Sequence, residues 1–425
     1  MWDKLKNIWR VKEVRNGLIF VIAMMVVFRL AANIPLPGID LIALRRFFDS
    51  NQLMGMLNLF SGGTIRTFSI VAMGVAPYIT ASIIFQLLGM IVPRIEEIQK
   101  DGEAGQRRIN QWTRWLTIPL SIIQSFSILQ ILRQSQLHIL TITNTLQLVT
   151  IICTVTAGTL LLMWIGELIS EKKVGNGVSL MIFAGILASL PSTVSQFLAT
   201  YDSSQFFTII LYVVVALLTV VGVVFVTEGQ RNVPVQYARQ TRGMSGGTGG
   251  VISSLPLRVN MVGVIPIIFA ISLLIFPSVI AQFLVHAKTA WVAGAAQWVL
   301  LVIQNRWVYG ISYFVLVVGF TYFYTAVVFH PDRIAENLQK QGGFVPGIRP
   351  GKPTTEYLQN IIQRITLGGA LFLGAIAVLP LVVQGFTGSQ SMALGGTSLL
   401  IVVSVVIESV KQIEAQLTMR EYDVY

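Results

Sequence analysis

The stretch Phe206–Val226 reads FFTIILYVVVALLTVVGVVFV and holds no charged side chain. An α-helix needs about 20 mostly apolar residues to cross the hydrocarbon core of a bilayer. This stretch is therefore predicted to be a membrane-spanning helix. Nine other apolar stretches of the chain are separated in the same way by short polar loops. In chain order they are Gly17–Ala32, Gly74–Val92, Trp115–Leu132, Leu146–Ile169, Val178–Leu190, Met261–Val285, Val308–Phe329, Ile361–Val383 and Thr397–Val410.

The composition agrees with a chain that lies largely in a membrane. Hydrophobic residues make up 54% of the 425 residues and charged residues only 12%, which is about half the charged fraction of soluble domains. The apolar stretches are spread evenly, and no long soluble insert divides them. We therefore predict an all-α polytopic membrane protein with ten transmembrane helices in one bundle, which moves something across or within the membrane.

The basic residues predict the orientation of the chain. Most of the 30 Lys and Arg residues lie in the first segment, in the loops after the second, fourth, sixth and eighth spans, and in the tail. The loops 191–205 and 384–396 contain none. Because cytoplasmic loops retain Lys and Arg, both termini are predicted to face the cytoplasm.

Two of the predicted cytoplasmic loops are long enough to project from the membrane. In 228–260, apolar and polar residues alternate through Val233–Tyr237 before the glycine-rich stretch Gly243–Gly250, which predicts a hairpin. In 330–357, the residues Ala335–Gln341 favour a helix, and the rigid run GGFVPGIRPGKPT follows. Loops of this length either only connect spans or bind a partner, and the residues alone leave both possibilities open.

The chain lacks the residue patterns typical of an enzyme. His138, His286 and His330 are scattered without partners at ligand spacing, so no metal site is predicted. The run Gly347–Thr354 differs from a phosphate-binding loop, because only three residues separate its glycines and Pro353 stands where Ser or Thr is needed. We expect no enzymatic activity and no cofactor, with energy supplied by a partner or a gradient.

Charged side chains within the spans would indicate an ion-coupled transporter. Arg29 lies in the outer half of the first span, and Glu167 and Glu408 lie near cytoplasmic ends, so we interpret all three as snorkelling or interface residues. A proton or sodium relay needs acidic residues near the middle of the membrane, and the spans offer none. A secondary transporter for a neutral solute remains an alternative, and a membrane-embedded enzyme ranks last.

One segment between the first two spans is unusual. Leu53–Met73, LMGMLNLFSGGTIRTFSIVAM, is too polar to span and too apolar for a solvated loop, and Ser61–Gly63 interrupts it. Non-helical backbone at membrane depth is tolerated only inside protein or beside a water-filled cavity. The segment is therefore either a re-entrant packing element or part of a cavity wall.

Seven blocks of sequence, in order along the chain, carry a resemblance to a known family. They are LNLFSGGTIRTFSI, GVAPYITASIIFQLL, GEAGQRRINQWTR, GNGVSLMIFAGI, LPLRVNMVGVIPIIFA, FVPGIRPGKPT and GGTSLLIVVSVVIE. Together they resemble the SecY family, the central channel subunits of preprotein translocases, over essentially the whole chain.

The resemblance implies a protein-conducting channel that translocates unfolded preproteins and releases transmembrane segments laterally into lipid. Its ten helices would form two pseudo-symmetric five-helix halves, residues 1–190 and 191–425, around a central pore. A lateral gate would lie between spans two and three on one side and spans seven and eight on the other. A plug at about residues 55–70 would close the pore.

The resemblance also assigns site residues. The pore ring would be Ile79, Ile83, Ile182, Ile186, Ile268 and Ile401. Two pairs among them are spaced i, i+4, which independently places each pair on one helix face. The plug would include Leu57, Phe60, Ser61, Gly62, Gly63, Thr64, Ile65 and Arg66.

Four arginines would contact the motor or the ribosome: Arg231, Arg239, Arg242 and Arg349. The implied partners are the small subunits SecE and SecG, the SecA motor ATPase, the ribosome, preprotein signal sequences and membrane lipid. The implied location is a bacterial plasma membrane, with a thylakoid as the alternative. The tip Gly243–Gly250 carries less charge than family members often have there, which weakens the case for ribosome binding by this loop.

Overall fold

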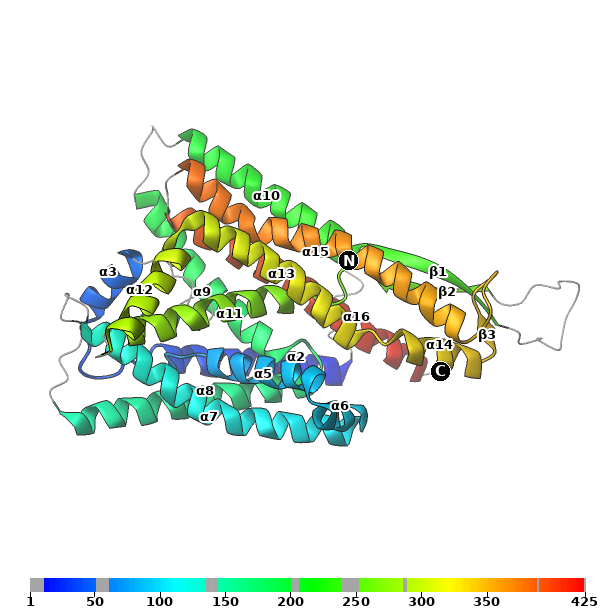
Figure 1. The fold of residues 1–425 in the computed structure, drawn as a ribbon, viewed down its shortest axis with the longest axis horizontal. Coiled ribbons are helices and arrows are strands. Elements are labelled where there is room, and N and C mark those ends of the chain that lie inside the picture. The colour runs from blue at the N-terminus through cyan, green and yellow to red at the C-terminus, as the bar shows by residue number, and fades with distance from the viewer. Residues whose placement is uncertain are drawn as a thin grey trace, which may run out of the picture.

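The computed structural model describes residues 11–50, 61–134, 139, 144–199, 206–237, 252–285, 289–387 and 390–423. Each predicted span is helical, and these helices run side by side along the length of the molecule (Figure 1). In chain order they are α2 (Lys12–Ala32), α5 (Ala76–Ile91), α7 (Glu103–Gln134), α8 (Thr145–Glu171), α9 (Gly177–Ala199), α10 (Phe206–Glu228), α11 (Ile265–Leu284), α13 (Arg306–Val328), α15 (Lys352–Thr387) and α16 (Gln390–Asp423). The prediction of an all-α fold is confirmed.

Among the described residues, five helices are long and apolar enough to cross a membrane, or six if α5 and α6 (Pro93–Lys100) form one span bent by 108°.

Prolines shape several of these helices. Pro93 opens α6, and Val92 before it is extended (φ −106°, ψ 108°), because proline disfavours a helical conformation in the preceding residue. Pro191 in α9 and Pro277 in α11 likewise interrupt the hydrogen-bond ladders of their helices.

Three strands and one short helix project from one end of the bundle (Figure 1). The sheet has the order β2–β1–β3, and both pairings are antiparallel. The elements are β1 (Gln230–Tyr237), β2 (Ile252–Arg258), β3 (Gly343–Phe344) and α14 (Pro331–Lys340). The predicted hairpin and the predicted helix in 330–357 are confirmed. The hairpin tip, residues 238–251, lies outside the described residues.

A separate hydrophobic cluster holds this projection together. Val233 of β1, Leu257 of β2, Val345 and Leu358 are buried against one another, with Ile361 and Ile362 of α15. We call the three strands, α14, the connection 345–351 and the first turns of α15 the sheet platform. Because it has its own apolar core, the sheet platform is a folded unit and does more than connect two spans.

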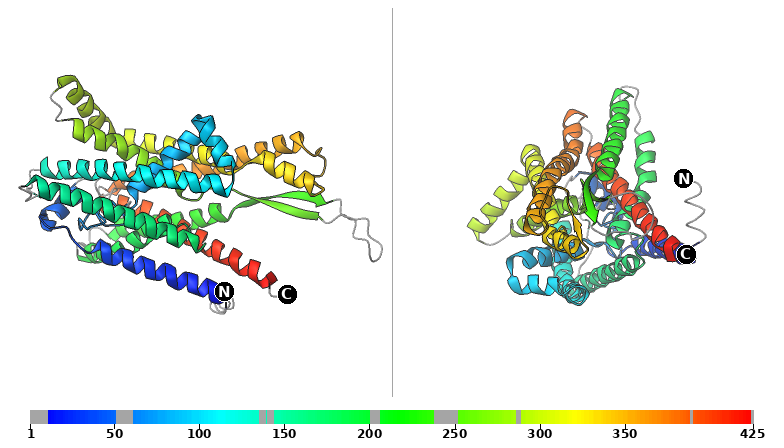
Figure 2. Two further views of the ribbon diagram at one scale, coloured as in Figure 1. Left: turned by 90° about the horizontal axis from the view of Figure 1, so that it is seen from below. Right: turned by 90° about the vertical axis from the view of Figure 1, so that its right-hand side faces the viewer.

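The first turn of α2 and the last turn of α16 lie at the same end of the bundle as the sheet platform (Figure 2). The first and last described helices thus begin and end at one end of the bundle, and the cytoplasmic orientation of both termini stays a prediction. At the opposite end lie α3 (Leu41–Ser50) and α12 (Ala290–Gln304) (Figure 1). The predicted division between halves after residue 190 falls inside α9, which continues to Ala199.

Candidate functional site: an isoleucine cluster between a cavity and a glycine turn

The six isoleucines predicted to line a pore come from four helices and lie in one hydrophobic cluster. All are buried, with exposed fractions between 1% and 6%. Ile79 and Ile83 lie one turn apart on α5, and Ile182 and Ile186 lie one turn apart on α9, so each pair presents one helix face. Ile268 of α11 and Ile401 of α16 complete the set. The structure therefore brings together side chains that are up to 322 positions apart in the chain.

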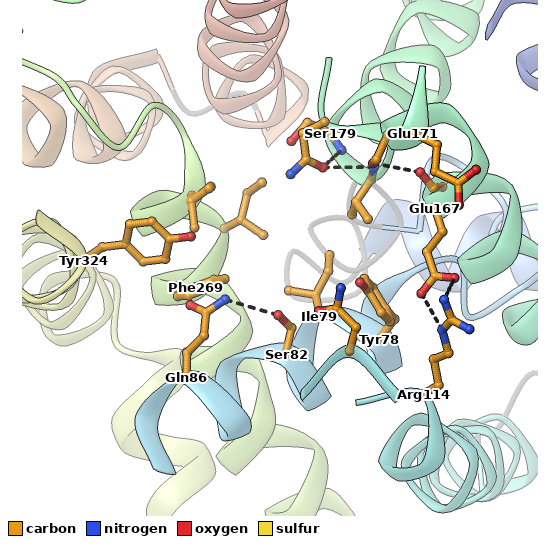
Figure 3. A pocket seen from close by; sticks show the side chains of 17 residues that line it. Tyr78, Ile79, Ser82, Gln86, Arg114, Glu167, Glu171, Ser179, Phe269 and Tyr324 are labelled. Atoms are coloured by element: carbon orange, nitrogen blue, oxygen red, sulfur yellow. Dashed lines mark hydrogen bonds and ion pairs between the residues drawn. The ribbon is translucent and has the colours of Figure 1, made fainter. Parts of the chain in front are cut away.

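A cavity of about 460 Å³ lies on one side of this cluster. Its lining comes from α5, α7, α8, α9, α11 and α13 and includes Ile79 and Ile268 (Figure 3). Much of the rest of the lining is polar: Ser82, Gln86, Asn110, Arg114, Glu167, Ser170, Glu171, Asn176 and Ser179. A hydrated cavity can thus end on an apolar floor formed partly by two of the six isoleucines.

The two flanks of the cavity differ in chemistry (Figure 3). On one flank, Arg114 of α7 forms an ion pair with Glu167 of α8, with Nη2 2.7 Å from Oε2. On the other, Phe269 of α11 and Tyr324 of α13 pack edge to face, with ring centroids 5.9 Å apart. Between them, Gln86 Nε2 donates a hydrogen bond to Ser82 Oγ on α5 (3.2 Å). Sequence reasoning did not pick out the aromatic pair, since aromatic side chains are common in apolar spans.

The glycine turn Ser61–Gly63 lies against the same isoleucine cluster. Ser61 and Gly62 border a small void together with Ile182, Met181 and Phe28. Gly62 has a φ of +72°, a region that favours glycine, and a Cβ added to Gly185 of α9 would overlap its Cα. The backbone of this turn therefore packs directly on α9, one turn away from Ile182.

Hydrogen bonds order the residues that follow the glycine turn. Thr64 Oγ1 donates to the carbonyl oxygens of Ser61 (2.8 Å) and Ala72 (3.1 Å), and it is fully buried. Ile65 is also buried, whereas Arg66 is partly exposed. Leu57 and Phe60, the other predicted plug residues, lie outside the described residues. The described part of the predicted plug is thus folded within the protein, as expected for irregular backbone at membrane depth.

Two of the four predicted contact arginines are described, and both are exposed on the sheet platform. Arg231 lies on β1 opposite Leu257 of β2. Arg349 lies two residues after Gly347 (φ +81°), and its carbonyl accepts a hydrogen bond from Thr354 Oγ1 (2.9 Å). Arg239 and Arg242 lie outside the described residues.

The structure changes our interpretation of two charged residues. Arg29 Nη1 donates to the carbonyl oxygen of Gly62 at 3.0 Å, so it does not simply extend toward the interface. Glu167 pairs with Arg114 in the cavity wall. In neither case does sequence spacing reveal the contact, because the partners are 33 and 53 positions apart. Among the described residues, no group of three or more His, Cys, Asp or Glu is placed to hold a metal ion.

Comparison with known proteins agrees with this architecture. The family model described as SecY matches residues 69–410. The protein translocase subunit SecY of Streptomyces galbus is 41% identical over 437 residues, which cover 98% of this chain and 97% of the relative.

Three solved structures share the fold. One is a protein-conducting channel (TM-score 0.66, 16% identity, 94% of this chain and 91% of the other). Another is a SecY protein whose plug domain stabilises the closed channel and maintains a membrane seal (TM-score 0.63, 18% identity, 94% and 91%). The third is Sec61 in the canine ribosome–channel complex of the endoplasmic reticulum (TM-score 0.62, 16% identity, 94% and 91%). Because the family model and the curated relative both extend over most of the sequence, the chain belongs to the SecY family.

Proposed function

We propose that this chain is the pore subunit of a protein translocase, through which unfolded preproteins cross the membrane and transmembrane segments leave laterally into lipid. The observation that carries this proposal is the buried isoleucine cluster between a largely polar cavity and the glycine turn. Membership in the SecY family and the fold shared with protein-conducting channels support it.

An isoleucine constriction suits the passage of a polypeptide. Apolar side chains offer neither charge nor hydrogen bonds, so a moving chain of any sequence binds them weakly. A closed apolar constriction also excludes ions, because water leaves it. In this proposal Ile79, Ile83, Ile182, Ile186, Ile268 and Ile401 form the pore ring, and the segment at about residues 55–70 is the plug beneath it. No chemical step is required, so the protein acts as a channel and not as an enzyme.

A seam between α5 and α7 on one side and α11 and α13 on the other would serve as the lateral gate. Helix α11 packs against α5, α7 and α13, and the cavity of Figure 3 lies along this seam. A signal sequence is a short apolar helix, so separation of α11 from α5 would expose it to lipid. In this arrangement residues 1–190 and 191–425 form the two halves that separate.

The sheet platform would receive the driving partner on the cytoplasmic side. The positive-inside rule supports the proposal that this end, with both termini, faces the cytoplasm. Arg231 and Arg349 are exposed on it, and Arg239 and Arg242 follow β1 in the chain. We propose that these residues contact the SecA motor or the ribosome, that SecE and SecG complete the complex, and that the complex lies in a bacterial plasma membrane or a thylakoid.

Crosslinking of an arrested preprotein tests the proposed function. Single cysteines replace Ile83, Ile186 or Ile401 after Cys153 has been changed to serine, and a fourth replaces Leu218, which is 64% exposed on α10. We expect adducts at the three isoleucine positions that depend on SecA and ATP. We expect no adduct at Leu218. Their absence in an assembled complex would mean that the isoleucines are ordinary packing residues.

A further inference from the structure

The segment after the glycine turn is attached through its backbone to residues 34–36, which follow the end of α2. Leu36 N donates to Phe68 O and Ile70 N donates to Ile34 O, each at 3.0 Å. These bonds flank an isolated antiparallel bridge between Pro35 and Ser69. Backbone pairing does not depend on any one side chain, so this attachment is expected to persist when the plug moves.

Phe68 and Ile65 strengthen the same attachment. Both are buried, at 1% and 2% exposed, in a hydrophobic cluster with Leu36 and with residues of α7 and α8. Thr67 Oγ1 adds a hydrogen bond to the carbonyl oxygen of Ala32 (2.9 Å). We call the stretch Thr67–Ile70 the anchored arm.

The tip of the segment is held differently. Gly62 has no side chain, and its carbonyl accepts from Arg29 Nη1 at 3.0 Å. The guanidinium carbon of Arg29 also lies 5.7 Å from the centroid of the Phe28 ring, which itself approaches Gly62. A cationic donor to a carbonyl makes one of the stronger hydrogen bonds in proteins. The charged side chain of Arg29 thus holds the tip, together with the packing of the tip on Gly185 of α9 and the hydrogen bond from Thr64 Oγ1 to Ser61 O. The arm is held by backbone pairing and core contacts that do not involve Arg29.

The position of Arg29 makes this contact reversible. Arg29 lies in the last turn of α2, and Asn33 caps that helix end by donating from Nδ2 to the carbonyl oxygen of Arg29 (2.8 Å). Its neighbour Leu30 is 64% exposed, and Arg29 itself is partly exposed. A long side chain at the end of a span can reach polar surroundings when its partner moves away. When Gly62 is released, the Arg29 guanidinium can therefore reach polar surroundings and is not left in contact with lipid alone.

We propose that Arg29 is the positioning residue that latches the Ser61–Gly63 tip in the closed state, and that the anchored arm is the hinge about which the tip moves. The inference rests on the proposed function, because only a channel has a closed state. The hold of Arg29 on the tip can be tested separately from that function. The latch predicts that loss of Arg29 releases the tip and leaves the arm in place.

Cysteine labelling separates these two movements. Ser61 and Ser69 are buried at 2% and 0% exposed, one in the tip and one in the anchored arm, so Ser61→Cys and Ser69→Cys form a matched pair. Each is made in the assembled complex with Cys153→Ser and treated with a membrane-impermeant maleimide from each side in turn. We expect Arg29→Met to speed labelling of Ser61→Cys about tenfold or more, as expected for loss of a hydrogen bond to a charged group. Ser69→Cys should stay protected.

Asn33→Ala is the control for damage to the end of α2, since it removes a hydrogen bond there without touching Gly62. It should leave both cysteines protected. If Arg29→Met does not assemble, Arg29→Gln, which loses the charge and the reach, replaces it with the same expectation. Unchanged labelling of Ser61→Cys, or equal exposure of both cysteines, would overturn the latch.

Resting ion conductance of the same variants distinguishes failure of the latch from failure of the proposed function. Faster tip labelling with raised conductance supports both. Faster tip labelling without any rise in conductance would support the latch and contradict a sealing role for the tip. Raised conductance with a protected tip would overturn the latch alone.

Discussion

Arg114 and Glu167 are joined by two parallel contacts, with Nε 2.8 Å from Oε1 and Nη2 2.7 Å from Oε2. This forked geometry uses both carboxylate oxygens and fixes orientation as well as distance. The pair joins α7 to α8 in the wall of the cavity. It therefore sets the position of α7, one of the helices proposed to flank the lateral gate.

Replacement of Arg114 by methionine is expected to destabilise the complex modestly. The Glu167 side chain is 18% exposed and loses its cation, but Arg114 is 51% exposed, so solvent screening limits the loss to about 1 kcal/mol. Thermal unfolding of the purified complex measures it. Arg107→Met is the control, because its ion pair with Glu103 involves side chains that are 83% and 94% exposed. An equal loss in both variants would contradict the prediction.

Replacement of Ile83 by aspartate is expected to make the resting channel conduct ions. A carboxylate within the isoleucine cluster attracts water and removes the apolar barrier. Conductance of the complex in planar bilayers measures the effect. Ile91→Asp serves as the control, since Ile91 lies on the same helix but is 76% exposed. If both variants conduct as little as the parent, Ile83 does not belong to the constriction.

Replacement of Gly185 by alanine is expected to displace the glycine turn and raise resting conductance. The added methyl group would overlap backbone atoms of Gly62, which cannot rotate away as a side chain can. Gly319→Ala in α13 is the matched control, because nothing lies within 4 Å of the added atom. Alanine there gains up to about 1 kcal/mol of helix propensity. Unchanged resting conductance of the Gly185→Ala variant would show that the glycine turn can shift without opening the channel to ions.

Reversal of the charge at Arg349 is expected to stop export while the protein still folds and inserts. The side chain is exposed on the sheet platform, so Arg349→Glu removes no packing. ATP-dependent translocation into inverted vesicles measures the effect, and immunoblotting confirms that the complex is present. Arg107→Glu applies the same change to an exposed arginine near the start of α7 and should export normally. Normal export by Arg349→Glu would remove this residue from the contact surface.

Thr354→Val is expected to weaken export through Arg349. The Thr354 hydroxyl donates to the carbonyl oxygen of Arg349. Loss of this hydrogen bond is expected to destabilise the backbone conformation at Arg349 by about 1 kcal/mol. Thr354→Ser keeps the hydroxyl and should restore export. Normal export by Thr354→Val would show that this hydrogen bond does not order Arg349 for its contact.

The sequence predicted the helices and the hairpin well because both depend on local patterns. Apolar runs without charge have few alternatives to a membrane helix, and the alternation at Val233 has few alternatives to a strand. The isoleucine set was predicted chiefly from family resemblance, since helical spacing alone relates Ile79 to Ile83 but not to Ile268. The structure places all of them in one cluster, but whether they line a pore remains a prediction.

Contacts across the fold could not be predicted from the sequence. Their places near the ends of spans predict that Arg29 and Glu167 are snorkelling or interface residues. No sequence pattern marks their partners, because every residue carries a backbone carbonyl and Arg114 lies on another helix. The packing of Gly62 on Gly185 was equally hidden, since close approach of two glycines leaves no hydrophobic pattern.

Helix α15 links the sheet platform to the interior of the bundle without a break. Its 36 residues extend over about 54 Å at 1.5 Å per residue. Leu358, near its start, is buried in the hydrophobic cluster of the sheet platform. Leu373 and Ala377, further along, are buried in the cluster that contains the six isoleucines. A tilt of the sheet platform would therefore be transmitted along α15 as along a stiff rod, so mechanical work done on the platform would reach the isoleucine cluster without unfolding any helix on the way.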